Sequence, residues 1–134
     1  MLKPDCVRRG LEAIVYDMIV SAGLKIVFKK RMQLDPQKLH GLYGKWDYKE
    51  FYPNLCEYMM SDEVEVFIVE GDNAIFTLQS VVGEKNSSCY PKHTIRGRFA
   101  ISQRENVVHS TNDQQTFIEE VNLLLGTEAK RWLV

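Results

Sequence analysis

The spacing of apolar residues changes at Gly23, and this change constrains the fold more than any other feature of the sequence. Before the glycine, apolar side chains recur every three to four positions, at Leu11, Ile14, Val15, Met18, Ile19 and Ala22. After it, over 24–34, apolar residues alternate with charged and polar ones in LKIVFKKRMQL. The first spacing predicts a helix with one buried stripe, and the second predicts a half-buried strand. A chain with both patterns is expected to form an α+β fold.

The rest of the chain continues this mixture of helix and strand. Asp35 and Pro36 are typical of the N-cap and first turn of a short helix. We expect the later elements to be a helix over 51–60, a strand over 63–71, a helix over 74–83, a surface loop over 84–93, a short buried strand at Val107 and Val108, and a final helix from an Asp113 cap to Leu125. This order predicts a sandwich with helices on one face of a small sheet.

The composition is that of a soluble globular protein with a single domain, residues 1–134. Hydrophobic residues make up 45% of the chain, charged residues make up 26%, and the net charge is −1. A charge so near zero excludes a general attraction to nucleic acid or membrane. No apolar run approaches the ~18 residues that span a bilayer. Cys6, Cys56 and Cys89 form no CxxC pair, so we expect reduced thiols in a cytoplasmic protein.

Four short motifs together indicate a function that no single residue would indicate. A lone histidine such as His109 is more often structural or on the surface than catalytic. The motifs are LKPD at 2–5, YGKWDYKEFYPNL at 43–55, TIRG at 94–97 and NVVHSTND at 106–113. In this order and at these separations, they resemble the nucleoside diphosphate kinase family.

The resemblance extends from Leu2 to about Gly126 and implies both a fold and a reaction. The implied fold is a ferredoxin-like βαββαβ sandwich, with a four-stranded antiparallel sheet and helices packed on it. Only Met1 and Leu2 precede Lys3, so the first strand is expected to be shortened. The implied reaction is a ping-pong transfer, in which a histidine takes the γ-phosphoryl group from a nucleoside triphosphate and passes it to a nucleoside diphosphate.

The resemblance also implies roles for individual residues. His109 would be the phosphorylated residue, because a neutral imidazole is both a nucleophile and a leaving group near pH 7. Phosphoryl transfer asks the protein mainly to position the nucleophile and neutralise charge. The other implied roles are phosphate-contacting cations at Lys3 and Arg96, a tyrosine near the histidine at Tyr43, a sugar and phosphate contact at Asn106, and an apolar clamp for the base at Phe51 and Leu55. Stacking alone would give broad base specificity.

Helical geometry bears on Glu120 independently of the resemblance. At about 100° per residue, Glu120 lies roughly a quarter-turn from the centre of the apolar stripe of its helix, and Glu119 points nearly opposite. Glu120 can therefore reach inward. By resemblance it is the glutamate that orients the histidine ring, and Thr111 stands where the family has a serine in the same hydrogen-bonded group.

Several departures from the family pattern support an alternative function. Gln79 occupies the position of a phosphate-binding arginine, Lys85 that of a threonine, and Ser110 that of a glycine beside the histidine. The alternative is a catalytically weak or inactive nucleotide-binding or scaffold module of the same fold. We hypothesise that Lys85 supplies the missing cation, so that Lys85 is also a candidate nucleotide-binding residue.

The expected ligands and partners follow from the resemblance. Mg²⁺ would be held mainly by the nucleotide phosphates, because the ion keeps several waters and needs few protein ligands. The chain is expected to form a homo-oligomer, for which hexamer, tetramer and dimer remain open. A third function, nucleic-acid binding by a basic run at Lys25, Lys29, Lys30 and Arg31, competes with a solvated strand face. The near-neutral charge favours the solvated face.

Overall fold

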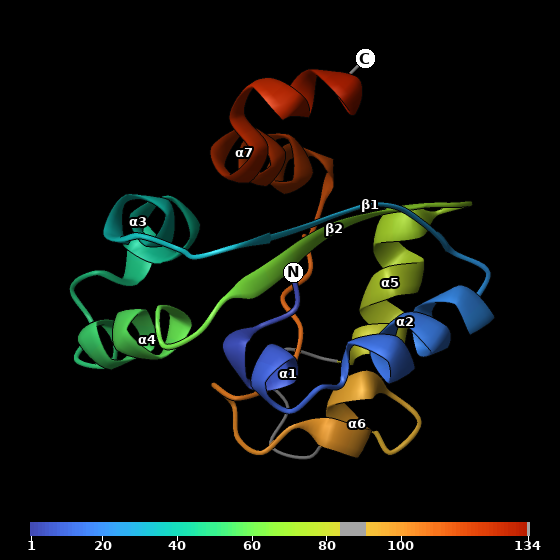
Figure 1. The fold of residues 1–134 in the computed structure, drawn as a ribbon, viewed down its shortest axis with the longest axis horizontal. Helices are drawn as coiled ribbons and strands as arrows, with labels where there is room; N and C mark the ends of the chain where they lie inside the picture. The colour runs from blue at the N-terminus through green and yellow to red at the C-terminus, as the bar shows by residue number, and fades with distance from the viewer. Residues whose placement is uncertain (84–90, 134) are drawn as a thin grey trace.

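A computed structural model describes residues 1–83 and 91–133 (Figure 1). The helices are α1 (Pro4–Arg8), α2 (Glu12–Ser21), α3 (Pro36–Tyr43), α4 (Tyr52–Met59), α5 (Ala74–Val82), α6 (Ile95–Phe99) and α7 (Gln114–Leu125). The strands are β1 (Lys25–Met32) and β2 (Val64–Glu70), and short 3-10 turns occupy Gly44–Trp46 and Gly126–Arg131. The predicted α+β class is confirmed, and so are the helices and strands predicted between residues 11 and 83.

The sheet of the described residues contains two antiparallel strands, β1 and β2. Leu2 extends it by single bridges, to Glu65 of β2 on one side and to Val108 on the other. The Leu2 N–H donates to the Glu65 carbonyl at 2.8 Å, and the Lys3 N–H donates to the Val107 carbonyl at 2.9 Å. The predicted four-stranded sheet is therefore not confirmed. Val107 has a φ of 79°, outside the β region, so regular pairing stops there.

A bulge in β1 corrects the simple alternation predicted from the sequence. The register shifts between Ile26 and Phe28. Ile26 packs against the core on one side of the sheet and Phe28 against the core on the other, although their spacing predicts one face. An extra residue in one strand reverses the side-chain phase, and the sequence carries no local sign of it.

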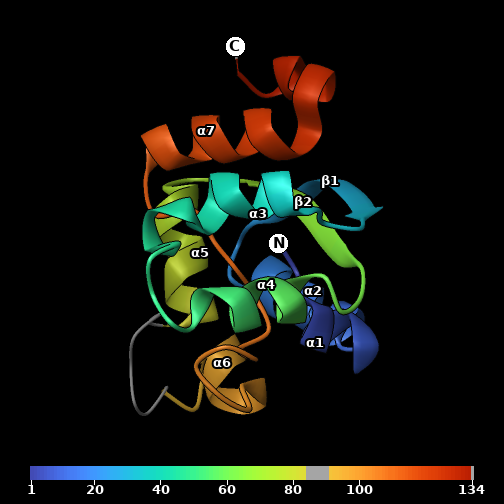
Figure 2. The ribbon, with the colours of Figure 1, turned by 90° about the vertical axis from the view of Figure 1, so that its left-hand side faces the viewer.

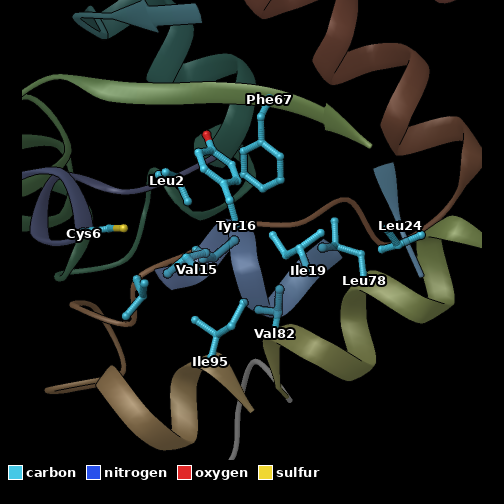
Figure 3. Packing of buried hydrophobic residues seen from close by; sticks show 12 residues of the cluster. Leu2, Cys6, Val15, Tyr16, Ile19, Leu24, Phe67, Leu78, Val82 and Ile95 are labelled. Atoms are coloured by element: carbon cyan, nitrogen blue, oxygen red, sulfur yellow. The ribbon is translucent and has the colours of Figure 1, made fainter. Parts of the chain in front are cut away.

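Helices cover both faces of the strand pair, so the prediction of helices on one face is wrong. Figures 1 and 2 show α7 on one side of the strands and α2, α5 and α6 on the other. The cause lies in β2, which is apolar on both faces: Val64, Val66 and Ile68 pack on the α7 side, and Phe67 packs on the α2 side. Figure 3 shows Phe67 meeting Tyr16 edge-on, with ring centroids 5.2 Å apart.

Side-chain caps fix the starts of three helices. The Asp35 carboxylate accepts from the Lys38 N–H at 2.8 Å, and the Asp113 carboxylate accepts from the Thr116 N–H at 2.7 Å, so both predicted caps are confirmed. Thr94 caps α6 by accepting from the Gly97 N–H at 2.9 Å.

Helix α6 lies in the TIRG motif, where no element was predicted, and its glycine has a packing reason. A Cβ at Gly97 would lie 1.8 Å from the Pro91 carbonyl oxygen. The turn that begins at Pro91 therefore packs tightly against α6, and only a glycine at position 97 leaves room for it.

Candidate functional site

The backbone turn before His109 is strained. The Val108 N–H donates to the Asn106 carbonyl at 2.9 Å, which closes a three-residue γ-turn centred on Val107. A positive φ of 79° is rare for a β-branched residue and costs energy, which burial of Val107 and Val108 offsets. The His109 N–H then donates to the Met1 carbonyl at 2.8 Å, so both sides of the turn are fixed to the sheet.

The imidazole of His109 is held from behind by Glu120. The distance between His109 Nε2 and Glu120 Oε2 is 2.7 Å, and the two side chains are 14% and 12% exposed. A carboxylate can only accept, so the proton of the neutral ring is assigned to Nε2 and the lone pair to Nδ1. Glu120 faces inward from α7 and Glu119 is exposed, as the helical geometry predicted.

Burial decides the charge of this histidine. It lowers the pKa of His109 below the usual 6.5, while the hydrogen bond and charge of Glu120 raise that pKa in part. Lys3 adds a smaller lowering effect. The ring is therefore neutral near pH 7. The Tyr43 ring meets it edge-on with centroids 5.9 Å apart, and burial raises the pKa of the Tyr43 hydroxyl, which stays protonated.

His109 opens onto a cavity of about 1020 Å³, large enough for a nucleotide. Phe51 and Leu55, at the start of α4, form part of an apolar wall. Of the residues that the sequence predicts for the site, the structure brings seven together on the cavity wall: Lys3, Tyr43, Phe51, Leu55, Arg96, Asn106 and His109. Thr111 and Glu120 do not line this cavity, although Glu120 reaches His109 from behind. Lys85 lies outside the described residues.

Lys3 and Asn106 form a buried polar pair on the cavity wall. Lys3 Nζ donates to Asn106 Oδ1 at 2.6 Å and to the Arg104 carbonyl at 3.2 Å. Asn106 Nδ2 donates in turn to the Gln103 carbonyl at 2.9 Å. With Lys3 only 7% exposed, its ammonium is positioned before any ligand arrives.

Arg96 stabilises the backbone around the site. Its guanidinium donates to the carbonyls of Gly83 at 2.9 Å, Val108 at 2.6 Å and Asn106 at 3.4 Å. The side chain is 5% exposed. Arg96 therefore joins the end of α5 to the turn that precedes His109, a structural role that the sequence did not predict.

Gln79 and Thr111 differ from the expected arrangement. Gln79 Nε2 donates to the Thr111 carbonyl at 3.3 Å and to the Asn112 carbonyl at 3.4 Å, so this amide ties the chain after His109 to α5. Among the described residues, Glu120 Oε1 is buried without a hydrogen-bond partner. The implied bond between Thr111 and Glu120 is therefore absent in this structure, and the Thr111 backbone is anchored instead.

Two further properties concern metals and membranes. Across residues 1–83 and 91–133, His, Cys, Asp and Glu side chains nowhere gather into a group that could hold a metal ion. Within the same ranges, no helix combines the length and apolar character that crossing a membrane requires.

The cavity, the oriented imidazole and the motifs around them agree with a comparison against known families. A family model for nucleoside diphosphate kinase matches residues 1–129. The chain belongs to the nucleoside diphosphate kinase family. The nucleoside diphosphate kinase of Ignicoccus hospitalis is 36% identical over 123 residues, which cover 92% of this chain and 84% of the relative.

Solved structures of the nucleoside diphosphate kinase family share the fold. The halophilic nucleoside diphosphate kinase from Halobacterium salinarum, solved in complex with CDP, matches with a TM-score of 0.88 and 26% identity, over 96% of this chain and 86% of that one. The nucleoside diphosphate kinase from Encephalitozoon cuniculi matches with a TM-score of 0.89 over 99% of this chain and 95% of that one. At 24% identity, the second likeness bears on the fold alone.

Sequence reasoning missed some residues of this nucleoside diphosphate kinase site. Trp46 lines the cavity and stacks with Tyr43, with centroids 6.4 Å apart. Gln103 and Arg104 also line it. Trp46 lies inside the motif at 43–55, where a large aromatic ring is a feature that indicates a ligand contact. The other two lie in a stretch without periodicity, which gave no signal.

Proposed function

We propose that this chain transfers the γ-phosphoryl group of a nucleoside triphosphate to a nucleoside diphosphate through a phosphohistidine at His109. The observation that carries the proposal is the His109–Glu120 pair at 2.7 Å on the wall of the cavity. In the first half-reaction, the Nδ1 lone pair forms a bond to the γ-phosphorus while the bond to the bridging β-phosphate oxygen breaks. The nucleoside diphosphate leaves with that electron pair, and the second half-reaction reverses these steps on another nucleoside diphosphate.

Glu120 has a distinct role in this proposal. Phosphorylation at Nδ1 leaves the ring with a proton on Nε2 and a positive charge. A carboxylate 2.7 Å from Nε2 stabilises that charge in a site with little water. Glu120 is therefore a positioning and charge-stabilising residue, which accepts the same hydrogen bond throughout the cycle.

The remaining predicted residues divide into phosphate, sugar and base contacts. Lys3 supplies a positioned positive charge for the phosphates. Arg96 contributes its fixed positive charge, although three backbone carbonyls already engage its donors. We further propose sugar and phosphate contacts by Asn106, support of the ring by Tyr43, a hydrogen-bonding role for Thr111 once substrate binds, stacking of the base on Phe51 and Leu55, and a phosphate contact by Lys85.

Mg²⁺ belongs to the proposal as part of the substrate. When bound, the ion neutralises phosphate charge during transfer. Glu120 is the carboxylate beside His109 and is already hydrogen-bonded to it, so this donor set does not suit a resident ion. The ion would be held by the nucleotide phosphates and its waters.

Radiolabelled phosphate transfer tests the proposed function. Incubation with ATP labelled at the γ-phosphate should label the chain in an acid-labile, base-stable form, and a nucleoside diphosphate should remove the label. His109→Gln should abolish labelling. His93→Gln is the matched control, because His93 lines the same cavity and is expected to leave labelling intact.

The same experiment separates the kinase from the inactive nucleotide-binding module. Nucleotide binding without any label on the unaltered chain would favour the module, and label that persists in His109→Gln would refute the assignment of the nucleophile. The motivation for keeping the module is Gln79, whose amide binds backbone where an arginine would offer charge.

We also propose a homo-oligomer, a ferredoxin-like sheet and a cytoplasmic location. Ile14 and Val20 are exposed on α2, at 37% and 53%, and such apolar side chains are suited to a subunit interface. Light scattering at two protein concentrations would test the assembly, because a monomer at both would contradict it.

The order β1, β2, Leu2, Val108 follows a ferredoxin-like sheet in which two strands are reduced to single bridges.

A further inference from the structure

We infer that Arg104, with Gln103 beside it, binds the edge of the nucleotide base and gives the site a preference for guanine. The inference rests on the proposed function, because it takes a nucleotide as the ligand. It goes beyond that function because stacking on Phe51 and Leu55 alone would distinguish poorly between bases.

The first argument is that the backbone at Arg104 is fixed in place. The Ile101 N–H donates to the Glu105 carbonyl at 2.9 Å, and the Ser102 hydroxyl accepts from the backbone N–H groups of Arg104 at 3.2 Å and Glu105 at 2.9 Å. These bonds close the segment between α6 and Asn106 into a tight turn. The backbone from which the Arg104 side chain extends is therefore held in place, so a contact by this side chain needs no ordering of the backbone.

The second argument is the position of this turn relative to the apolar wall. In Figure 2, the orange segment that follows α6 lies below α4, the helix whose start carries the apolar wall. Phe51, Leu55, Gln103 and Arg104 all line the same cavity. A base stacked on Phe51 would therefore have the turn within reach of its edge.

The third argument concerns the direction of the nucleotide. Its terminal phosphate must reach His109, so the base lies at the other end. From half-buried Arg104, the chain runs through buried Asn106, Val107 and Val108 to His109. Lys3 Nζ donates to both Asn106 Oδ1 and the Arg104 carbonyl, so the Lys3 ammonium lies beside this segment. The Arg104 side chain starts at the end of this segment that is farther along the chain from His109, and we infer that this is the base side.

The fourth argument is that the Arg104 guanidinium is available. In the part of the chain that the structure describes, this guanidinium makes no hydrogen bond or ion pair, in contrast to Arg96, which is engaged by three carbonyls. Arg104 is half-buried on the cavity wall. A half-buried cation without a partner is suited to an acceptor brought by a ligand.

The hydrogen-bond donors of the Arg104 guanidinium determine which base it prefers. A guanidinium only donates, and it pairs best with two adjacent acceptors. Guanine presents such a pair at O6 and N7, whereas adenine places an amino donor beside N7 and cytosine presents an amino donor. The Gln103 amide has a donor and an acceptor and adds a weaker contact. The geometry therefore favours guanine nucleotides.

Calorimetric titration of the full chain with GDP, ADP, UDP and CDP tests the inference. The unaltered protein should bind GDP most tightly, and Arg104→Ala should weaken GDP by about tenfold while changing the other three little. Arg104→Lys keeps the positive charge but lacks the paired donors of the guanidinium, so it should not restore the preference for GDP. Arg98→Ala is the matched control. The Arg98 guanidinium lies over the ring of the neighbouring Phe99, and Arg98 does not line the cavity, so this variant should leave the affinities for all four nucleotides unchanged.

Each other result overturns the inference. Equal binding of all four nucleotides by the unaltered protein would refute it, and so would a uniform loss in Arg104→Ala that lysine rescues, because that pattern belongs to a phosphate contact. The outcome is separable from the proposed function. Label on His109 without base preference would overturn this inference alone, and base preference without label would overturn the transfer reaction alone.

Discussion

Replacement of Glu120 by glutamine isolates the charge that the structure places behind His109. The amide keeps the size of the side chain and can still accept the Nε2 proton, so the geometry at 2.7 Å is largely retained. A hydrogen bond to a charged group contributes about 1.5–3 kcal/mol, against about 1 kcal/mol for a neutral pair. The difference, about 0.5–2 kcal/mol, acts mainly on the charged phosphorylated ring and should slow transfer about 2- to 30-fold.

The assay is a single-turnover measurement, because steady-state kcat can report product release instead of chemistry. Quenched-flow mixing of Glu120→Gln with radiolabelled ATP should give a slower rate of His109 labelling at unchanged nucleotide affinity. Glu119→Gln is the matched control, since Glu119 is the exposed neighbour on α7. A thermal melt of each variant separates lost chemistry from lost folding.

The pH profile provides a second measurement that a purely structural role would not change. Burial lowers the pKa of His109, and Glu120 raises it in part. Activity of the unaltered chain should therefore be retained as pH falls to 6.5 and be lost only as pH falls through the lowered pKa. Removing the carboxylate should move this acid limb to still lower pH. A labelling rate within about twofold of the unaltered chain, with an unmoved limb, would refute the role of Glu120.

Three further predictions concern stability, measured as the free energy of unfolding in urea. Ile19→Ala should cost about 2–5 kcal/mol because Ile19 is fully buried, whereas Ile101→Ala, at a position that is 63% exposed, should stay within about 0.5 kcal/mol; equal costs would contradict the packing of α2. Gly97→Ala should cost about 3 kcal/mol, since its Cβ would lie 1.8 Å from the Pro91 carbonyl oxygen, and an unchanged midpoint would disprove the tight turn. Asp113→Ala should lower stability at pH 7. Because the hydrogen bond from the Thr116 N–H lowers the pKa of Asp113 below 3.8, this cost should shrink as pH falls through that lowered pKa, and a pH-independent cost would contradict the cap.

Local patterns in the sequence determined the elements that depend on their own residues. The apolar stripe of α2, the presence of a strand at β1 and the caps at Asp35 and Asp113 were all predictable, because periodicity and capping act over a few residues. The same local geometry placed Glu120 inward. Assignment of the site residues needed the spacing of four motifs, because no local rule joins Lys3 to His109.

Tertiary structure decided the features whose causes lie far away in the chain. The bulge that separates Ile26 from Phe28 depends on the register with β2, and the single bridges of Leu2 depend on two neighbours that are distant in sequence. Arg96 carries a charge that suits phosphate, yet its hydrogen bonds go to three backbone carbonyls that only the folded chain brings together. Sequence thus determined which chemical groups are present and which local elements form. Folding decided which partners each buried group meets, because a buried donor must find an acceptor wherever packing places one.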